Sequence, residues 1–88
     1  MNISTLEAYV EQKNTWTRIF KGKELSLLNA KDRQAIANSI DADMSPENLT
    51  CDGELPPAMV REKMRRLTRC AEELLSIDPT VSFYEMGV

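Results

Sequence analysis

The sequence predicts an all-α fold, a small bundle of three to four helices in a single domain over residues 1–88. Two observations carry this prediction. In three segments of the chain, apolar residues recur at spacings of three and four, the periodicity of a helix with one buried face. Residues 58–76 contain strong helix formers and neither Gly nor Pro, which predicts a long helix near the C-terminus. A chain of this length has room for one core only.

The N-terminal segment predicts a helix that starts at a capping box and ends at Gly22. Ser4 and Glu7 have the spacing at which a hydroxyl and a carboxylate cap each other's backbone amides. The face expected to be buried is mostly apolar and holds Leu6, Tyr9, Lys13, Trp16 and Phe20. An alternative stays open, because residues 15–20 are rich in β-branched and aromatic side chains. In that alternative, residues 15–28 form a hairpin.

A second helix is expected over residues 29–40, with Asn29 as its N-cap. Asp41 and Asp43 are expected to end it. A short helical turn is expected after Ser45, because Ser caps helices and Pro46 suits the first helical position. Residues 41–54 contain five acidic residues and no basic one, so this segment carries a local charge of −5.

The long helix is expected from Pro57 to about Leu75 and carries a narrow apolar seam. The seam residues repeat at spacings of four and three, which suits packing against another helix. They are Val60, Met64, Leu67, Ala71 and Leu74. A chain this short buries only about 60 to 65% of its unfolded surface, so a second copy would supplement a thin core. We therefore expect a homodimer that forms through this seam or through the apolar C-terminal tail.

A basic face is expected on the same helix. It consists of Arg61, Lys63, Arg65, Arg66 and Arg69, and residues 61–70 carry a local charge of +4. Three interpretations stay open: a solvated face paired with nearby acidic residues, a docking surface for an acidic protein partner, and contact with the phosphates of DNA or RNA. A charge run is most often a solvated face. Between the two kinds of ligand, the net charge of −3 favours protein over nucleic acid.

The C-terminal residues 79–88 form an apolar tail. Asp78 and Pro79 are expected to end the long helix. The apolar residues of the tail are Val81, Phe83, Tyr84 and Met86. A tail with this composition is expected to dock, either on the chain's own core or on a partner.

The residue types argue against an enzyme. The chain has no His, which removes the usual base of serine and cysteine nucleophiles, and it has no glycine-rich phosphate-binding motif. Cys51 and Cys70 alone cannot supply the ligands of a zinc site, so neither a metal nor a cofactor is expected. The N-terminus carries no apolar signal segment, which favours a cytoplasmic location with both thiols reduced and no membrane association.

Residues 45–57, with the sequence SPENLTCDGELPP, resemble small accessory proteins of temperate bacteriophages of enteric bacteria. The resemblance implies a small regulator that binds a host or phage protein, and it assigns no role to any residue. The sequence therefore predicts a non-enzymatic protein-interaction or regulatory module that self-associates and binds a protein partner. The alternative is a nucleic-acid-binding accessory protein that uses the basic face of the helix over residues 57–76.

Overall fold

Five helices follow one another along residues 2–22 and 24–84, the parts of the chain that the structure, a computed structural model, describes. They are α1 (Ile3–Ile19), α2 (Glu24–Leu27), α3 (Ala30–Asp43), α4 (Pro46–Leu49) and α5 (Pro57–Ile77). These residues contain no strand, so the all-α fold with a long C-terminal helix is confirmed. None of the described helices has the length and apolar character that crossing a bilayer requires.

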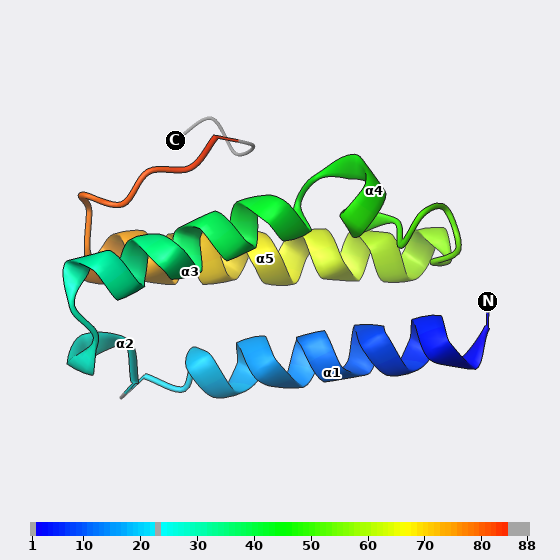
Figure 1. Cartoon of the computed structure of the whole chain (residues 1–88), viewed down its shortest axis with the longest axis horizontal. Coiled ribbons are helices and arrows are strands. Elements are labelled where there is room, and N and C mark those ends of the chain that lie inside the picture. The colour runs from blue at the N-terminus through cyan, green and yellow to red at the C-terminus, as the bar shows by residue number, and fades with distance from the viewer. Residues whose placement is uncertain (1, 23, 85–88) are drawn as a thin grey trace.

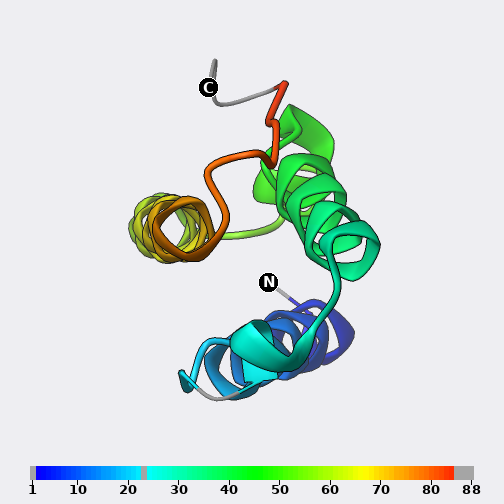
Figure 2. The same cartoon turned by 90° about the vertical axis from the view of Figure 1, so that its left-hand side faces the viewer.

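The three longer helices, α1, α3 and α5, surround the core. α3 lies beside α5, and α1 runs along one side of this pair, at the bottom of the view in Figure 1. Seen from the end of the molecule, the three helices stand at the corners of a triangle (Figure 2). After α5 the chain turns back and passes over α3 and α5 on the side that faces away from α1.

Helix α1 begins earlier than the predicted capping box. Asn2 is the N-cap, and its side-chain oxygen accepts a hydrogen bond from the Thr5 amide at 2.7 Å. The box between Ser4 and Glu7 is therefore wrong, because both residues lie inside the helix. Asn is as good a cap as Ser, and its position one residue before Ile3 fixes where the helix starts.

The hairpin alternative for residues 15–28 is also wrong, since α1 continues to Ile19 and α2 follows. The hydroxyls of the two threonines in this segment are satisfied within the helix. Thr15 and Thr17 donate their hydroxyls to backbone carbonyls four residues earlier, at 2.9 and 2.8 Å. The helix ends before Gly22, which adopts the left-handed conformation with φ of +85° in the turn toward α2.

Helix α3 has the predicted N-cap, because the Asn29 side chain accepts a hydrogen bond from the Asp32 amide at 2.9 Å. Its predicted end at Ile40 is wrong, since the helix continues to Asp43. The acidic side chains expected to break it have partners elsewhere in the fold. Asp41 is buried and accepts a hydrogen bond from the Tyr84 amide at 2.9 Å. Asp43 accepts a hydrogen bond from the indole N–H of Trp16 in α1.

The segment between α3 and α5 makes the short helical turn α4, with Pro46 at its first position as predicted. A turn follows in which Cys51, Asp52 and Gly53 all have positive φ, at 50°, 55° and 84°. Pro57 opens α5 as predicted, and the helix extends two residues beyond the expected end, to Ile77.

The core lies between α3 and α5 and is closed by α2, the end of α1 and the returning tail. The side chains of Leu25, Ile40, Leu67 and Leu74 are fully buried there. Each contributes about 1.5–3 kcal/mol of apolar burial. Two residues of the predicted self-association seam, Leu67 and Leu74, are thus part of the internal core, together with Ala71.

Candidate functional site

A groove of about 520 Å³ runs between α1 and α5. Residues from the second half of α1 and the turn after it form one wall, and the outward side of α5 forms the other. The groove is lined by Lys13, Trp16, Thr17, Phe20 and Lys21 on the first wall, and by Glu62, Arg65, Arg66, Arg69, Cys70 and Glu73 on the second. It combines an aromatic floor with a mostly cationic rim.

The floor is fixed by Trp16, which is one of the two buried residues of α1. Its indole N–H donates to Asp43 Oδ2 on α3 at 2.9 Å, so the ring cannot turn without losing this bond. The Phe20 ring packs against it in a tilted arrangement, with the ring centroids 6.0 Å apart. The two rings present a rigid apolar surface to the groove.

Arg66 ties the two walls together at one end of the groove. Its guanidinium carbon lies 5.2 Å from the centroid of the Tyr9 ring, within the range of a cation–π contact. Its Nη2 donates to Gln12 Oε1 at 3.0 Å, while its Nε is buried and has no hydrogen-bond partner among the described residues. Arg66 therefore joins α5 to α1.

The rim is partly neutralised by one ion pair. Lys13 Nζ lies 2.8 Å from Glu62 Oε1, and each side chain is about half exposed. The hydrogen bond and the opposite charge raise the pKa of Lys13 and lower the pKa of Glu62. Arg65 and Arg69 are exposed and form no ion pair with any residue that the structure describes. These two guanidinium groups and the exposed Lys21 are the cations that the groove offers to a ligand.

The structure divides the predicted basic face. Arg65, Arg66 and Arg69 line the groove together, while Arg61 is exposed and does not line it. Lys63 is not part of a surface at all, because it is 2% exposed and its ammonium donates to the Asn48 carbonyl in α4. Burial lowers the pKa of Lys63.

Helical spacing carries a signal that separates Lys63 from the basic face. Lys63 stands four residues before Leu67 and seven before Cys70, so it belongs to the stripe that faces the core. Its ammonium donates to the carbonyl of Asn48 in α4. Lys63 is therefore a structural residue that attaches α4 to α5.

The apolar residues predicted for partner contact are mostly internal. Leu67, Ala71 and Leu74 are buried in the core, so they present no surface to a second chain. Met64 is 41% exposed and Val60 is half-buried. The middle of this seam therefore cannot form the predicted self-association surface.

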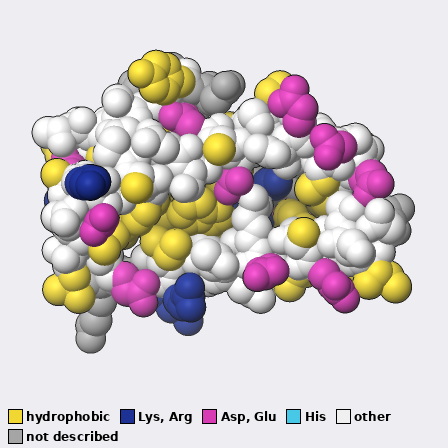
Figure 3. All heavy atoms as spheres, in the orientation of Figure 1, with side chains coloured by type: hydrophobic (Ala, Val, Ile, Leu, Met, Phe, Trp, Pro, Cys, Tyr) yellow, Lys and Arg dark blue, Asp and Glu magenta, His cyan; other side chains and the backbone are white. Residues whose placement is uncertain are grey.

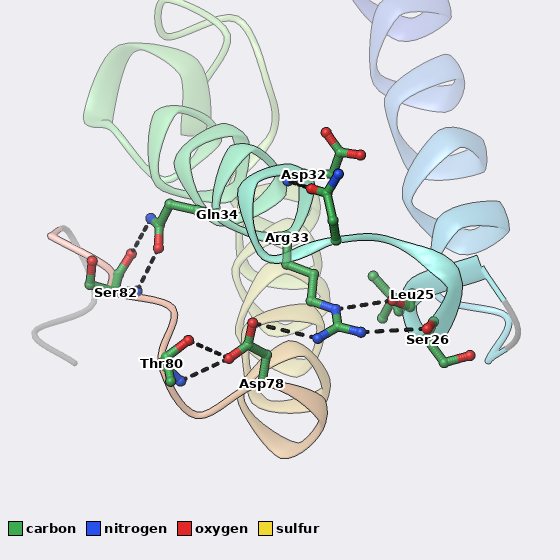
Figure 4. A network of polar contacts seen from close by, with 9 residues as sticks. Leu25, Ser26, Asp32, Arg33, Gln34, Asp78, Thr80 and Ser82 are labelled. Carbon is green, nitrogen blue, oxygen red and sulfur yellow. Dashed lines mark hydrogen bonds and ion pairs between the residues drawn. The ribbon is translucent and has the colours of Figure 1, made fainter.

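The tail docks on the chain's own core, one of the two outcomes left open by the sequence. Val81 and Phe83 are buried in the core cluster, and Tyr84 is 88% exposed. Gln34 of α3 holds this segment by two hydrogen bonds with the backbone of Ser82, at 3.1 Å each (Figure 4). Met86, the remaining predicted tail residue, lies outside the described residues.

The cysteines do not form a disulfide, and Cys70 is a core residue. Burial raises the pKa of the Cys70 thiol to about 11, which keeps it protonated at neutral pH. Within the described part of the chain, no cluster of three or more His, Cys, Asp or Glu side chains could hold a metal ion.

The groove depends on residues that sequence reasoning assigned to other roles. Lys13, Trp16 and Phe20 were expected on a buried face of the first helix, and Lys21 and Glu73 were given no role in binding. The arrangement suits a ligand that combines negative charge with an apolar group.

Comparisons with protein-family models, with curated proteins and with solved structures find no match to this chain.

Proposed function

We propose that the chain is a non-enzymatic protein-interaction module that binds an acidic segment of a protein partner in the groove between α1 and α5. One observation carries this proposal. The unpaired guanidinium groups of Arg65 and Arg69 stand beside the apolar floor made by Trp16 and Phe20. A segment with carboxylates and an apolar side chain would match both features, because Arg binds carboxylates through paired hydrogen bonds.

The distribution of charge supports an acidic partner. The groove is lined by five basic and two acidic residues, a local charge of +3, whereas the whole chain carries −3. A short acidic peptide can contact the groove without contacting the acidic residues elsewhere on the surface. A long polyanion such as DNA would also meet the acidic residues on the rest of the surface, which lowers its affinity. Binding of nucleic acid by the same arginines is therefore the alternative function.

A cytoplasmic location, self-association and the regulatory role implied by the resemblance to phage accessory proteins belong to this proposal as well. The two unpaired thiols support the location, because thiols stay reduced in a reducing compartment. Because the middle of the seam is buried, we place self-association on a different surface.

The test is binding of a fluorescein-labelled acidic peptide, about twelve residues of Glu interrupted by Leu, followed by fluorescence anisotropy at low salt. We expect the double variant Arg65→Glu/Arg69→Glu to weaken binding by about tenfold or more, because it replaces attraction by repulsion. Arg61→Glu is the matched control, since Arg61 is exposed on the same helix and does not line the groove. It should change binding less than about twofold.

Two further probes separate the alternatives. A peptide of the same length with Lys in place of Glu should not bind. A single-stranded oligonucleotide of similar charge should bind more weakly than the acidic peptide. Tighter binding of the oligonucleotide, lost in the double variant, would replace the proposal by the nucleic-acid reading. Equal loss of peptide binding in Arg61→Glu would show that the groove is not the site.

A further inference from the structure

The outward face of α1 is apolar and lies exposed. Ile3, Leu6 and Val10 follow one another at spacings of three and four, and they are 75%, 37% and 43% exposed. The buried residues of the same helix, Tyr9 and Trp16, lie on its other side. A shallow groove of about 690 Å³ follows the outward face from Leu6 toward the C-terminal end of the helix. An amphipathic helix with a second apolar stripe has an unused packing surface.

Charges along this face are segregated. Glu7 and Glu11 flank the groove in the first part of the helix, and Arg18 flanks it near the end. The space-filling view shows the same trend, with acidic side chains along α1 toward its N-terminal end and basic ones near its C-terminal end (Figure 3). A surface that is negative at one end and positive at the other is complementary to itself when one copy is reversed.

We propose that the outward face of α1 binds a second copy of this chain, as an antiparallel pair of α1 helices related by a two-fold axis. At 1.5 Å per residue, Glu7 and Arg18 are separated by about 16 Å along the helix. A two-fold axis midway between them passes close to the turn from Val10 to Asn14. It sets Glu7 of each chain opposite Arg18 of the other, once at each end of the contact.

The antiparallel arrangement follows from the charges. In a parallel pair, the acidic residues of both chains would lie together at one end and the arginines at the other, and like charges brought close together are destabilising. In the antiparallel pair both ends attract, and Val10 of each chain lies opposite Thr15 of the other, close to the axis. One helix from each chain covers less area than the ~1,200 Å² of a standard interface, so this dimer is weak and depends on concentration.

The experiment is sedimentation of the full chain over a concentration series, with two charge variants measured alone and mixed. Arg18→Glu gives a face that is acidic at both ends, and Glu7→Arg/Glu11→Arg gives one that is basic at both ends. Each variant alone should associate at least about fivefold more weakly than the wild type, because its copies repel each other. An equimolar mixture should associate at least as strongly as the wild type, since every facing pair in the mixed dimer is attractive.

The controls keep this test independent of the groove and of folding. The three substituted residues are exposed, so circular dichroism should report unchanged helicity. Arg65→Glu/Arg69→Glu, which alters the groove for the acidic partner, should dimerise like the wild type. A wild-type chain that stays monomeric at all concentrations would overturn the proposal. So would variants that dimerise like the wild type, or a mixture no stronger than its components.

Discussion

Gln34 and Ser82 hold each other by two hydrogen bonds between a side-chain amide and the backbone of the tail. Gln34 Nε2 donates to the Ser82 carbonyl and the Ser82 amide donates to Gln34 Oε1, both at 3.1 Å (Figure 4). The Gln34 side chain thus makes with the Ser82 backbone the pair of hydrogen bonds that a neighbouring β-strand would make. This pair lies between Val81 and Phe83, the two tail residues that enter the core.

The tail is expected to stabilise the fold through Phe83. We expect Phe83→Ala to lower the free energy of unfolding by about 3 kcal/mol, because it removes a buried aromatic ring from the core. Urea unfolding followed by circular dichroism measures this loss. The control is Tyr84→Ala, which alters the next, exposed residue and should stay within about 0.5 kcal/mol of the wild type. Similar losses for both variants would contradict the packing of the tail.

The turn after α5 should make stability depend on pH. Hydrogen bonds from the hydroxyl and the amide of Thr80 lower the pKa of Asp78, and Arg33, whose Nη1 lies 3.6 Å from Asp78 Oδ2, adds to this effect. Because the folded-state pKa is lowered, the unfolded chain binds the proton first as the pH falls. The contribution of Asp78 is therefore complete above the ordinary pKa of about 4 and is lost as the pH falls through the lower, folded value.

Thermal unfolding of Asp78→Asn against the wild type tests this dependence. The variant should melt at a lower temperature at pH 7, and the difference should shrink toward zero as the pH approaches about 2. Asp32→Asn is the control, because the exposed Asp32 carboxylate forms no ion pair with any described residue. A difference that is constant from pH 7 to pH 2 would show that the Asp78 charge has no part in stability.

Lys63 should matter for how α4 and the loop that follows it are held against α5. We expect Lys63→Met to cost about 1–2 kcal/mol, since methionine fills much of the space but removes the hydrogen bond that joins α5 to the Asn48 carbonyl. Chemical denaturation measures the cost, and hydrogen exchange of the amides around residues 48–55 should show faster opening of the loop. Arg61→Met on the same helix should leave both measurements within error, because Arg61 is exposed. Unchanged loop protection in Lys63→Met would contradict the attachment.

The two thiols should react at different rates. A pKa of about 11 leaves only about one Cys70 thiol in a thousand ionised at pH 8, and the side chain is also buried. A disulfide reagent such as Ellman's reagent should therefore modify one thiol quickly in the native chain and the second only on unfolding. The fast reaction should disappear in Cys51→Ser and persist in Cys70→Ser. Fast modification of both thiols under native conditions would show that the core opens around Cys70.

The sequence predicts the helices of this chain better than it predicts how they meet. Asn29 and Pro57 mark real helix starts because capping and proline geometry act locally. The end of α3 was misplaced because the partners that satisfy Asp41 and Asp43 come from residues 84 and 16, far away along the chain. Local signals contain no information on such contacts.

The candidate site shows the same limit. The seam through Leu67 and Leu74 is a genuine apolar stripe, and periodicity alone does not tell whether the chain's own helices or a second copy covers it. The groove requires Trp16 of α1 to face Arg69 of α5, and this depends on the packing of two helices separated by the whole of α3. The burial of Lys63 could have been predicted from the sequence, since its spacing to Leu67 places it on the stripe that faces the core.

The bond between the indole of Trp16 and the carboxylate of Asp43 has a practical consequence. This is the single tryptophan of the chain, and it lies where α1, α3 and the groove come together. Its fluorescence therefore responds both to the departure of α1 from the rest of the molecule and to a ligand that covers the aromatic floor. The protein carries its own optical probe for folding and for binding, without any added label.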